Sequence, residues 1–211
     1  LRHTVIGLHC EGTKISRVEV RDEATGEIKT VDADYVISTM PIRDLVQGIR
    51  SAVPADVGLA AQDLQYRDFV TVGVLYSGLN TPDGKLPDNW IYVQEADVKV
   101  GRIQVFNNWS PYLVSNPEYT WLGLEYFCQE GDDLWTMTDS RLIDLGIQEL
   151  ASLRLAEPKN FLDGVVIRMP KAYPAYFGGY ERFHLIRQYI DRFENLFLIG
   201  RNGMHRYNNQ D

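Results

Sequence analysis

Hydrophobic and polar positions alternate through the N-terminal part of the chain, which is the pattern of half-exposed β-strands. The clearest case is the VEVR sequence at 18–21. Turn sequences containing glycine separate three such segments, so strands are predicted at 4–9, 14–22 and 28–32. A fourth strand is predicted at 34–40, and Pro41 then starts a helix, since proline is tolerated in a first helical turn. The pattern therefore predicts a β-meander that returns to a parallel sheet.

Longer apolar segments and helical periodicities follow in the middle of the chain. A helix is predicted at 55–66 and a strand at 69–76, followed by a loop at 77–88 that is rich in glycine, proline and aspartate. Further strands are predicted at 90–93, 102–106, 120–128 and 165–169, and further helices at 138–153 and 179–193. Together these elements predict an α/β fold with α+β character, in which a mixed, largely antiparallel sheet is flanked by helices.

The C-terminal segment combines a short apolar strand, predicted at 196–199, with a polar turn that contains Gly200 and Gly203. A strand that runs through a glycine turn into a helix leaves backbone N–H groups available to an anion or a polarised ring. The chain stops at Asp211 within this predicted helix and opens on Leu1 within a predicted strand. We therefore expect the chain to be a C-terminal piece of a larger protein.

Three segments resemble the FAD-dependent amine oxidase and protoporphyrinogen oxidase superfamily. They are the C-terminal pattern Gly200-Arg201, Gly203, Arg206-Tyr207, Asn209 and Asp211, the stretch 33–41, and the stretch 170–174 followed by Gly179-Tyr180. The C-terminal spacing also resembles, without a gap, the Gly-Arg…Lys/Arg-Tyr-x-Asp-x-Asp segment of UDP-galactopyranose mutases. Two positions depart from the mutase pattern: Asn209 stands where the mutases have aspartate, and His205 stands where they often have tyrosine.

The resemblance implies FAD as the cofactor of the full-length protein. It implies that 1–54 is a partial FAD-binding domain, 55–190 a substrate-binding domain, and 191–211 the C-terminal FAD-binding strand and turn. No Gly-x-Gly-x-x-Gly sequence occurs in the chain, and in the resembling proteins this pyrophosphate-binding motif lies further upstream. We therefore expect this chain alone neither to hold FAD nor to be active.

The resemblance also implies the residues of the site, although it assigns none a catalytic role. The implied cofactor-binding residues are Thr39, Pro41, Gly200, Arg201, Gly203, Met204 and Asn209. The implied substrate-binding residues are Arg201, Tyr207, Tyr173 and Asn107. Structural roles remain open for two of them. Tyr173 could simply pack a proline-rich corner, and Asn107 could belong to a turn that buries Trp109.

Three functions remain open. The first is an FAD-dependent oxidoreductase, in which hydride passes from a C–H bond to flavin N5 and the protein supplies positioning and electrostatics. The second is a flavin-dependent isomerase like UDP-galactopyranose mutase, in which Arg201 and Tyr207 hold the diphosphate of a nucleotide sugar. The third is a non-catalytic module that retains the fold.

Composition excludes several other functions. The net charge of −8 argues against general nucleic-acid binding, which needs a basic surface. The apolar runs are too short to span a bilayer, and the four histidines and two cysteines show no metal-binding spacing. Cytoplasmic location is the default expectation. A small-molecule substrate is expected, and the sequence fixes neither its identity nor the oligomeric state.

The charge is unevenly distributed, because the last fifty residues are locally basic. Seven basic residues there face five acidic ones: Arg168, Lys171, Arg182, Arg187, Arg192, Arg201 and Arg206 against Asp163, Glu181, Asp191, Glu194 and Asp211. A basic segment in an acidic protein suggests an anionic ligand such as a diphosphate. Arg187 and Arg192 are interpreted as solvated helix residues, whereas Arg201 lies between turn glycines and is the better candidate for binding.

Overall fold

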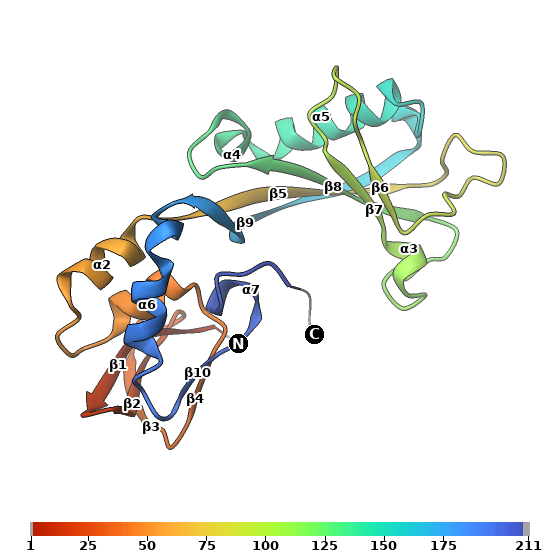
Figure 1. Ribbon diagram of the computed structural model, residues 1–211. Coiled ribbons are helices and arrows are strands. Elements are labelled where there is room, and N and C mark those ends of the chain that lie inside the picture. The colour runs from red at the N-terminus through yellow and green to blue at the C-terminus, as the bar shows by residue number, and fades with distance from the viewer. Residues whose placement is uncertain (1, 209–211) are drawn as a thin grey trace. The chain divides into compact units, whose positions relative to one another are not determined.

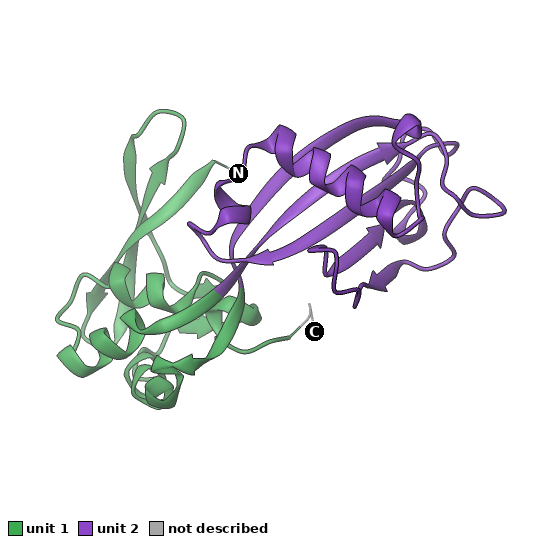
Figure 2. Cartoon of the chain, turned by 90° about the horizontal axis from the view of Figure 1, so that it is seen from above, with its two compact units in different colours: residues 1–66, 173–211 green, residues 67–172 purple. Residues whose placement is uncertain are grey.

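The computed structural model describes residues 2–208, which form two compact units (Figure 2). The first unit combines the chain up to Tyr66 with the chain from Tyr173 onward, and the second unit is Arg67–Ala172. The chain passes from one unit to the other twice, within strand β5 (Leu64–Tyr76) and within strand β9 (Phe161–Gly178). The second unit is therefore an insertion in the first.

The first unit begins with an antiparallel meander of β1 (His3–Glu11), β2 (Lys14–Asp22) and β3 (Ile28–Asp32), as the alternating pattern predicts (Figure 1). The predicted return to a parallel sheet is also confirmed. Strand β4 (Val36–Ser38) pairs in parallel with β10 (Leu196–Leu198), so that Ile37 lies opposite Phe197.

Asn195, directly before β10, joins the C-terminal part of the first unit to its N-terminal part. Its buried side chain accepts a hydrogen bond from the backbone N–H of Ile15 at 2.8 Å. It also donates to the carbonyl oxygens of Ile15, at 2.8 Å, and Asp34, at 2.9 Å. One amide thus joins β10 to the meander and to the segment that leads into β4, which fixes the register of the parallel pair.

Helices α1 (Ile42–Gly48), α2 (Ala55–Gln62) and α6 (Phe183–Ile190) complete the core of the first unit. Its fully buried side chains include Leu8, Ile15, Leu45, Leu64, Ile186 and Ile190. Each such aliphatic side chain contributes about 1.5–3 kcal/mol on burial, so this core holds the helices against the meander.

Two predicted helices of this unit need correction. The helix predicted at 55–66 ends at Gln62, because buried Leu64, Tyr66 and Asp68 alternate with exposed residues and extend β5 toward the N-terminus. The helix predicted at 179–193 begins as a 3₁₀ turn at Gly179–Arg182 and becomes α-helical only at Phe183. Gly178 has a left-handed φ of 65°, which a regular helix does not allow.

The second unit is built on a sheet with the strand order β6-β7-β8-β5-β9. β6 is Trp90–Tyr92, β7 is Arg102–Val105 and β8 is Thr120–Cys128, and these strands and β5 pair antiparallel. Helix α5 (Asp139–Ser152) packs on one face, where Leu142 and Leu150 join the buried residues of β5 and β8. The predicted sheet with its flanking helix is confirmed.

Several short elements of the second unit were not predicted. They are α3 (Phe106–Trp109), α4 (Asp133–Thr136) and the 3₁₀ helix Pro158–Asn160. The strand predicted at 165–169 is the middle of the much longer β9. Only this middle part has the β-branched sequence that identifies a strand, and hydrogen bonding to β5 sets its remaining length.

The boundaries between the compact units lie at 66/67 and 172/173. The domain boundaries predicted from the sequence lie at 54/55 and 190/191. Helices α2 and α6 therefore pack in the core of the first unit. The functional roles given to the domains stay predictions. A last short helix, α7 (Gly200–Gly203), follows β10, and no helix within residues 2–208 is long and apolar enough to cross a bilayer.

Candidate functional site

The turn after β10 packs closely against the end of β4. The Ile199 N–H donates to the carbonyl oxygen of Ser38 at 3.0 Å, which continues the parallel ladder into the turn. Gly200 then adopts a left-handed φ of 71°. A Cβ on Gly203 would lie 2.6 Å from the Ser38 carbonyl oxygen, so only glycine fits this approach. The structure thus brings Gly200 and Gly203 beside Thr39, whose backbone follows Ser38.

An open cavity of about 550 Å³ borders the same place. Thr39, Met40 and Pro41 line it, together with residues of β1, β2 and α1. Its walls include the side chains of Val5, Leu8, Val18, Val36 and Leu45. Met204 is half-buried at the end of α7, and Asn209 lies outside the described residues. The structure therefore gathers most of the predicted cofactor-binding residues at one junction.

The chemistry of this junction fits a flat ring system with a polar edge. The Ser38 hydroxyl is buried and makes no hydrogen bond within residues 2–208. Buried polar atoms are normally paired, so an unpaired one beside a close backbone approach suits a ligand that supplies the missing partner. The residues present are thus compatible with the flavin of FAD.

Arg201 extends from α7 and lies against two tyrosine rings. Its guanidinium carbon is 4.9 Å from the centre of the Tyr173 ring and 5.0 Å from that of the Tyr207 ring. The two rings are stacked, with centres 5.9 Å apart and planes inclined by 27°. The backbone N–H of Tyr207 also donates to the Tyr176 hydroxyl. Three of the four predicted substrate-binding residues therefore form one cluster.

Arg201 has no acidic partner in the described part of this cluster. No carboxylate of residues 2–208 forms an ion pair with it, whereas Arg182 faces Asp63 and Arg50 faces Glu19. Contacts with aromatic faces hold the guanidinium by about 0.5–2 kcal/mol and leave its N–H groups able to bind an anion. The arrangement can therefore orient a phosphate or carboxylate of a ligand.

Asn107, the fourth predicted substrate-binding residue, belongs to the second unit and its amide is engaged with the backbone. It donates to the Tyr119 carbonyl at 2.8 Å and accepts from the Trp121 N–H at 3.1 Å. It also lines a pocket of about 200 Å³ with Lys85, Val105 and Thr120. Asn107 thus belongs to the second unit, and the Arg201 cluster belongs to the first.

A second aromatic cluster, which the sequence analysis missed, lies on the second unit. The Arg102 guanidinium carbon is 4.4 Å from the Trp90 ring centre and 5.9 Å from the Tyr92 ring centre. These two rings are parallel to within 5°. Buried Glu125 accepts from Arg102 Nε at 2.7 Å and also from Gln104. The missed signal was the pair of aromatics two positions apart on a strand, since such residues share one face.

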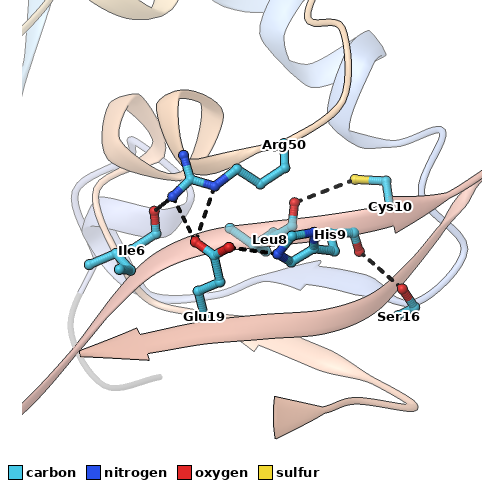
Figure 3. Close-up of polar contacts among 7 residues, drawn as sticks. All are labelled: Ile6, Leu8, His9, Cys10, Ser16, Glu19 and Arg50. Carbon is cyan, nitrogen blue, oxygen red and sulfur yellow. Dashed lines mark hydrogen bonds and ion pairs between the residues drawn. The ribbon is translucent and has the colours of Figure 1, made fainter. Parts of the chain in front are cut away.

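A third polar cluster holds the meander to the segment after α1 (Figure 3). Glu19 accepts hydrogen bonds from Arg50, at 2.7 Å from Nη2, and lies 2.7 Å from His9 Nε2. These two partners lower the pKa of the Glu19 carboxyl. The absence of a side chain at Gly7 provides the space for the Glu19 carboxylate, since a Cβ there would be 2.3 Å from Glu19 Oε2. All of its members bond to one another or to backbone, as Arg50 does to the Ile6 carbonyl, so this cluster is structural.

Comparisons with protein-family models and with curated proteins give no match. Solved structures do match. The chain is similar to a reduced UDP-galactopyranose mutase, with 24% identity and a TM-score of 0.75 over 97% of this chain and 41% of that one.

Two oxidases also share the fold. One is a protoporphyrinogen oxidase described as putative from Exiguobacterium sp. 255-15, with 18% identity and a TM-score of 0.62 over 96% of this chain and 44% of the other. The other is a redesigned putrescine oxidase, with 16% identity and a TM-score of 0.58 over 87% and 39%. The chain thus spans about two fifths of the length of these proteins, and what it shares with them is the fold.

Proposed function

We propose that this chain belongs to a flavin-dependent enzyme that acts on a nucleotide sugar and binds its diphosphate through Arg201. The observation that carries the proposal is the guanidinium between Tyr173 and Tyr207, which has no acidic partner within residues 2–208. The resemblance of the C-terminal segment to the mutases and the shared fold support the same function.

The residues of the cluster suit a diphosphate chemically. A guanidinium presents paired N–H donors that match two oxygens of a phosphate, and a lysine could not reproduce this fork. The Tyr173 and Tyr207 rings limit the movement of the guanidinium, so less freedom is lost when an anion binds. Since the chain has a net charge of −8, the attraction must be local, as this cluster allows.

The junction of β4 and β10 is the proposed place of the flavin. Thr39, Pro41, Gly200, Gly203 and Met204 would hold it, Asn209 would contribute from the segment that follows, and Arg201 would face both cofactor and substrate. When bound, the flavin supplies a reactive ring nitrogen for chemistry at the sugar carbon. The chain's own residues bind and orient the substrate: Arg201 holds the diphosphate in place, and the phenol groups of Tyr173 and Tyr207 can donate hydrogen bonds to its oxygens.

The second candidate function is an oxidoreductase that passes hydride to the flavin. The observation that favours it is the apolar character of β9, where Val165, Ile167 and Met169 are exposed side chains of alternate positions. A contiguous apolar face of this kind suits an apolar substrate better than a nucleotide sugar. The shared fold with two oxidases supports this candidate as well.

Substitution of Arg201 distinguishes the two functions. We expect Arg201→Ala to raise the dissociation constant for UDP by at least about tenfold, measured by titration calorimetry, because it removes a charge-assisted pair of hydrogen bonds. Arg201→Lys should recover only part of the affinity, since the ammonium keeps the charge without the fork. Arg187→Ala is the matched control, because Arg187 pairs with Asp191 on the exposed side of α6 and should not affect UDP.

A parallel titration follows flavin absorption in the flavin-loaded, full-length protein, with UDP-galactose added before and after reduction by dithionite. A spectral change that depends on reduction supports the mutase-like function. Absence of UDP binding in the unsubstituted protein, with flavin bands indifferent to UDP-galactose, would overturn it in favour of the oxidoreductase.

A further inference from the structure

His205 lies at the centre of the turn that carries Arg201 and Tyr207. Its side chain is completely buried, and its backbone has a left-handed φ of 45°. Positive φ is uncommon for residues other than glycine, and histidine is among the side chains that adopt it more often. This backbone conformation places the imidazole in the interior of the turn.

One hydrogen bond joins this imidazole to the neighbouring strand. His205 Nε2 is 3.2 Å from the carbonyl oxygen of Ala175 in β9. A carbonyl can only accept, so Nε2 carries a proton, and in the neutral imidazole Nδ1 then carries none. Nδ1 is buried and has no hydrogen-bond partner within residues 2–208. The environment thus selects the neutral imidazole in a single tautomer.

Aromatic rings enclose the imidazole on its other sides. The Tyr66 ring meets it edge-on with centres 5.0 Å apart. The rings of Tyr180 and Phe183 lie 5.8 Å and 5.7 Å away. This packing disfavours a charged imidazole, and burial lowers the pKa of His205.

The position of this contact in the two segments gives it a specific effect. Ala175 is two residues from Tyr173, and His205 is two residues from Tyr207. The Arg206 N–H donates back to the Arg201 carbonyl at 3.0 Å, so the turn behaves as one piece. The His205–Ala175 bond therefore helps to set the distance between the Tyr173 and Tyr207 rings, which flank Arg201. The bond from the Tyr207 N–H to the Tyr176 hydroxyl joins the same two segments.

We propose that His205 is the positioning residue of the anion site, and that its neutral imidazole locks the turn so that Arg201 stays between Tyr173 and Tyr207. This inference rests on the proposed anion binding by Arg201. It adds a consequence that anion binding alone does not have. A protonated imidazole places a charge and an unpaired Nδ1–H in the aromatic pocket, so it leaves the pocket and the turn releases the guanidinium.

The sign of the pH effect follows from the burial. The unfolded imidazole takes up a proton near pH 6.5 while the folded one resists, so the free energy of unfolding falls as the pH drops below 6.5. Charged groups on the surrounding elements are Arg43 on α1, which lies 5.3 Å over the Tyr66 ring and 3.8 Å from Asp44, and the exposed pair Asp63 and Arg182. Arg201 and Arg206 lie on its own segment. The bond to the Ala175 carbonyl favours the protonated imidazole, but burial has the larger effect on the pKa.

The test compares His205→Ala and His205→Gln with His184→Ala in the complete chain. The amide N–H of glutamine reaches the position of the imidazole Nε2 and does not titrate, so glutamine should rescue what alanine loses. His184 is an exposed histidine on α6 and serves as the matched control. Two readouts are measured: UDP affinity by calorimetry between pH 5 and 8, and the NMR signal of the Arg201 side-chain N–H, which the two tyrosine rings shift. The Arg201→Lys spectrum identifies this signal.

We expect His205→Ala to raise the UDP dissociation constant by about tenfold or more and to move the Arg201 signal toward that of an exposed arginine. His205→Gln should restore both. The unsubstituted protein should lose additional UDP affinity as the pH falls below 6.5, and His205→Gln should not. This difference removes the titration of UDP itself as an explanation. His184→Ala should change neither readout.

An unchanged Arg201 signal in His205→Ala, or the same pH profile in His205→Gln and the unsubstituted protein, would overturn the proposal. Failure of the unsubstituted protein to bind UDP would instead contradict the proposed function, and the Arg201 signal would still decide the role of His205. If His205→Ala does not fold, His205→Gln and its pH profile carry the test alone.

Discussion

At the scale of single residues, two glycines of the first unit have opposite roles. Gly203 faces the Ser38 carbonyl, where a Cβ would come within 2.6 Å of a backbone oxygen that cannot move aside. Gly58 lies within α2, and a Cβ there would meet nothing within 4 Å. The same substitution should therefore destabilise one place and stabilise the other.

We expect Gly203→Ala to lower the free energy of unfolding by about 1–3 kcal/mol, because the added methyl group forces the turn away from β4. Gly58→Ala should raise it by up to about 1 kcal/mol, the difference in helix propensity. Thermal or urea unfolding of both variants measures the effect. Equal changes in the two variants would show that the turn does not pack on β4 as described.

The sequence was sufficient to select the residues of the Arg201 cluster, because Arg201 and Tyr207 belong to one short motif and Tyr173 to a second one. It was not sufficient for Arg102 and Trp90. These residues meet only because β6 and β7 pair with Tyr92 opposite Arg102, and no local pattern determines a register across a loop. Asn107 was chosen from its loop context, and the bonds of its amide to the backbone could not be read from the sequence.

At the scale of elements, Glu149 on α5 connects the helix to the loop before β7. Its buried carboxylate accepts from the backbone N–H groups of Lys99, at 2.6 Å, and Val100, at 3.0 Å. It also accepts from the Tyr126 hydroxyl at 3.0 Å, so a charged group in the core is satisfied by three donors. Glu149 lies on the buried face of α5, where the periodic pattern of the helix alone predicts an apolar residue.

Glu149→Ala should lower the free energy of unfolding by about 3 kcal/mol, since it leaves buried donors without acceptors. Tyr126→Phe should cost about 1 kcal/mol, because two of the three bonds remain. Asp144→Ala, on the exposed side of the same helix, should change stability by less than about 0.5 kcal/mol. Urea unfolding of the three variants gives the comparison, and similar losses for Glu149 and Asp144 would contradict it.

Elements with a clear period were predicted well, and those shaped by distant contacts were not. Strands β2, β3 and β8 have the predicted limits, because turns or loops bound their apolar patterns. Strand β9 contains Pro170 in its middle and Gly178 at its end, and the local sequence at both positions disfavours a strand. Pairing with β5 overrides these preferences, and no single segment of the sequence contains that information.

At the scale of the whole molecule, the two cores are separate. Every buried residue of the second core lies within Arg67–Ala172, and every buried residue of the first lies outside that range. The ends of the inserted unit lie on β5 and β9, which are neighbours in one sheet, so cutting the chain there leaves the second core complete.

We expect residues 67–172 to fold on their own with a single cooperative urea transition, followed by tryptophan fluorescence. All four tryptophans lie in this unit, so the signal reports on it directly. A shorter piece, 67–144, lacks the buried Leu150 and β9 and should unfold without a cooperative transition. A gradual transition for 67–172 would show that the inserted unit depends on the first one.

The bonds of Asn195 to Ile15 have a consequence for the order in which the protein acquires its structure. They join positions 180 residues apart, and the parallel pairing of β4 and β10 spans a similar length of chain. Contacts between such distant positions form late, since a long loop must close before they yield any stabilisation. On the ribosome, Asn195 is synthesised only after the whole of the inserted unit, Arg67–Ala172. The turn that carries Arg201 therefore takes its place beside β4 only after Asn195 has met the meander.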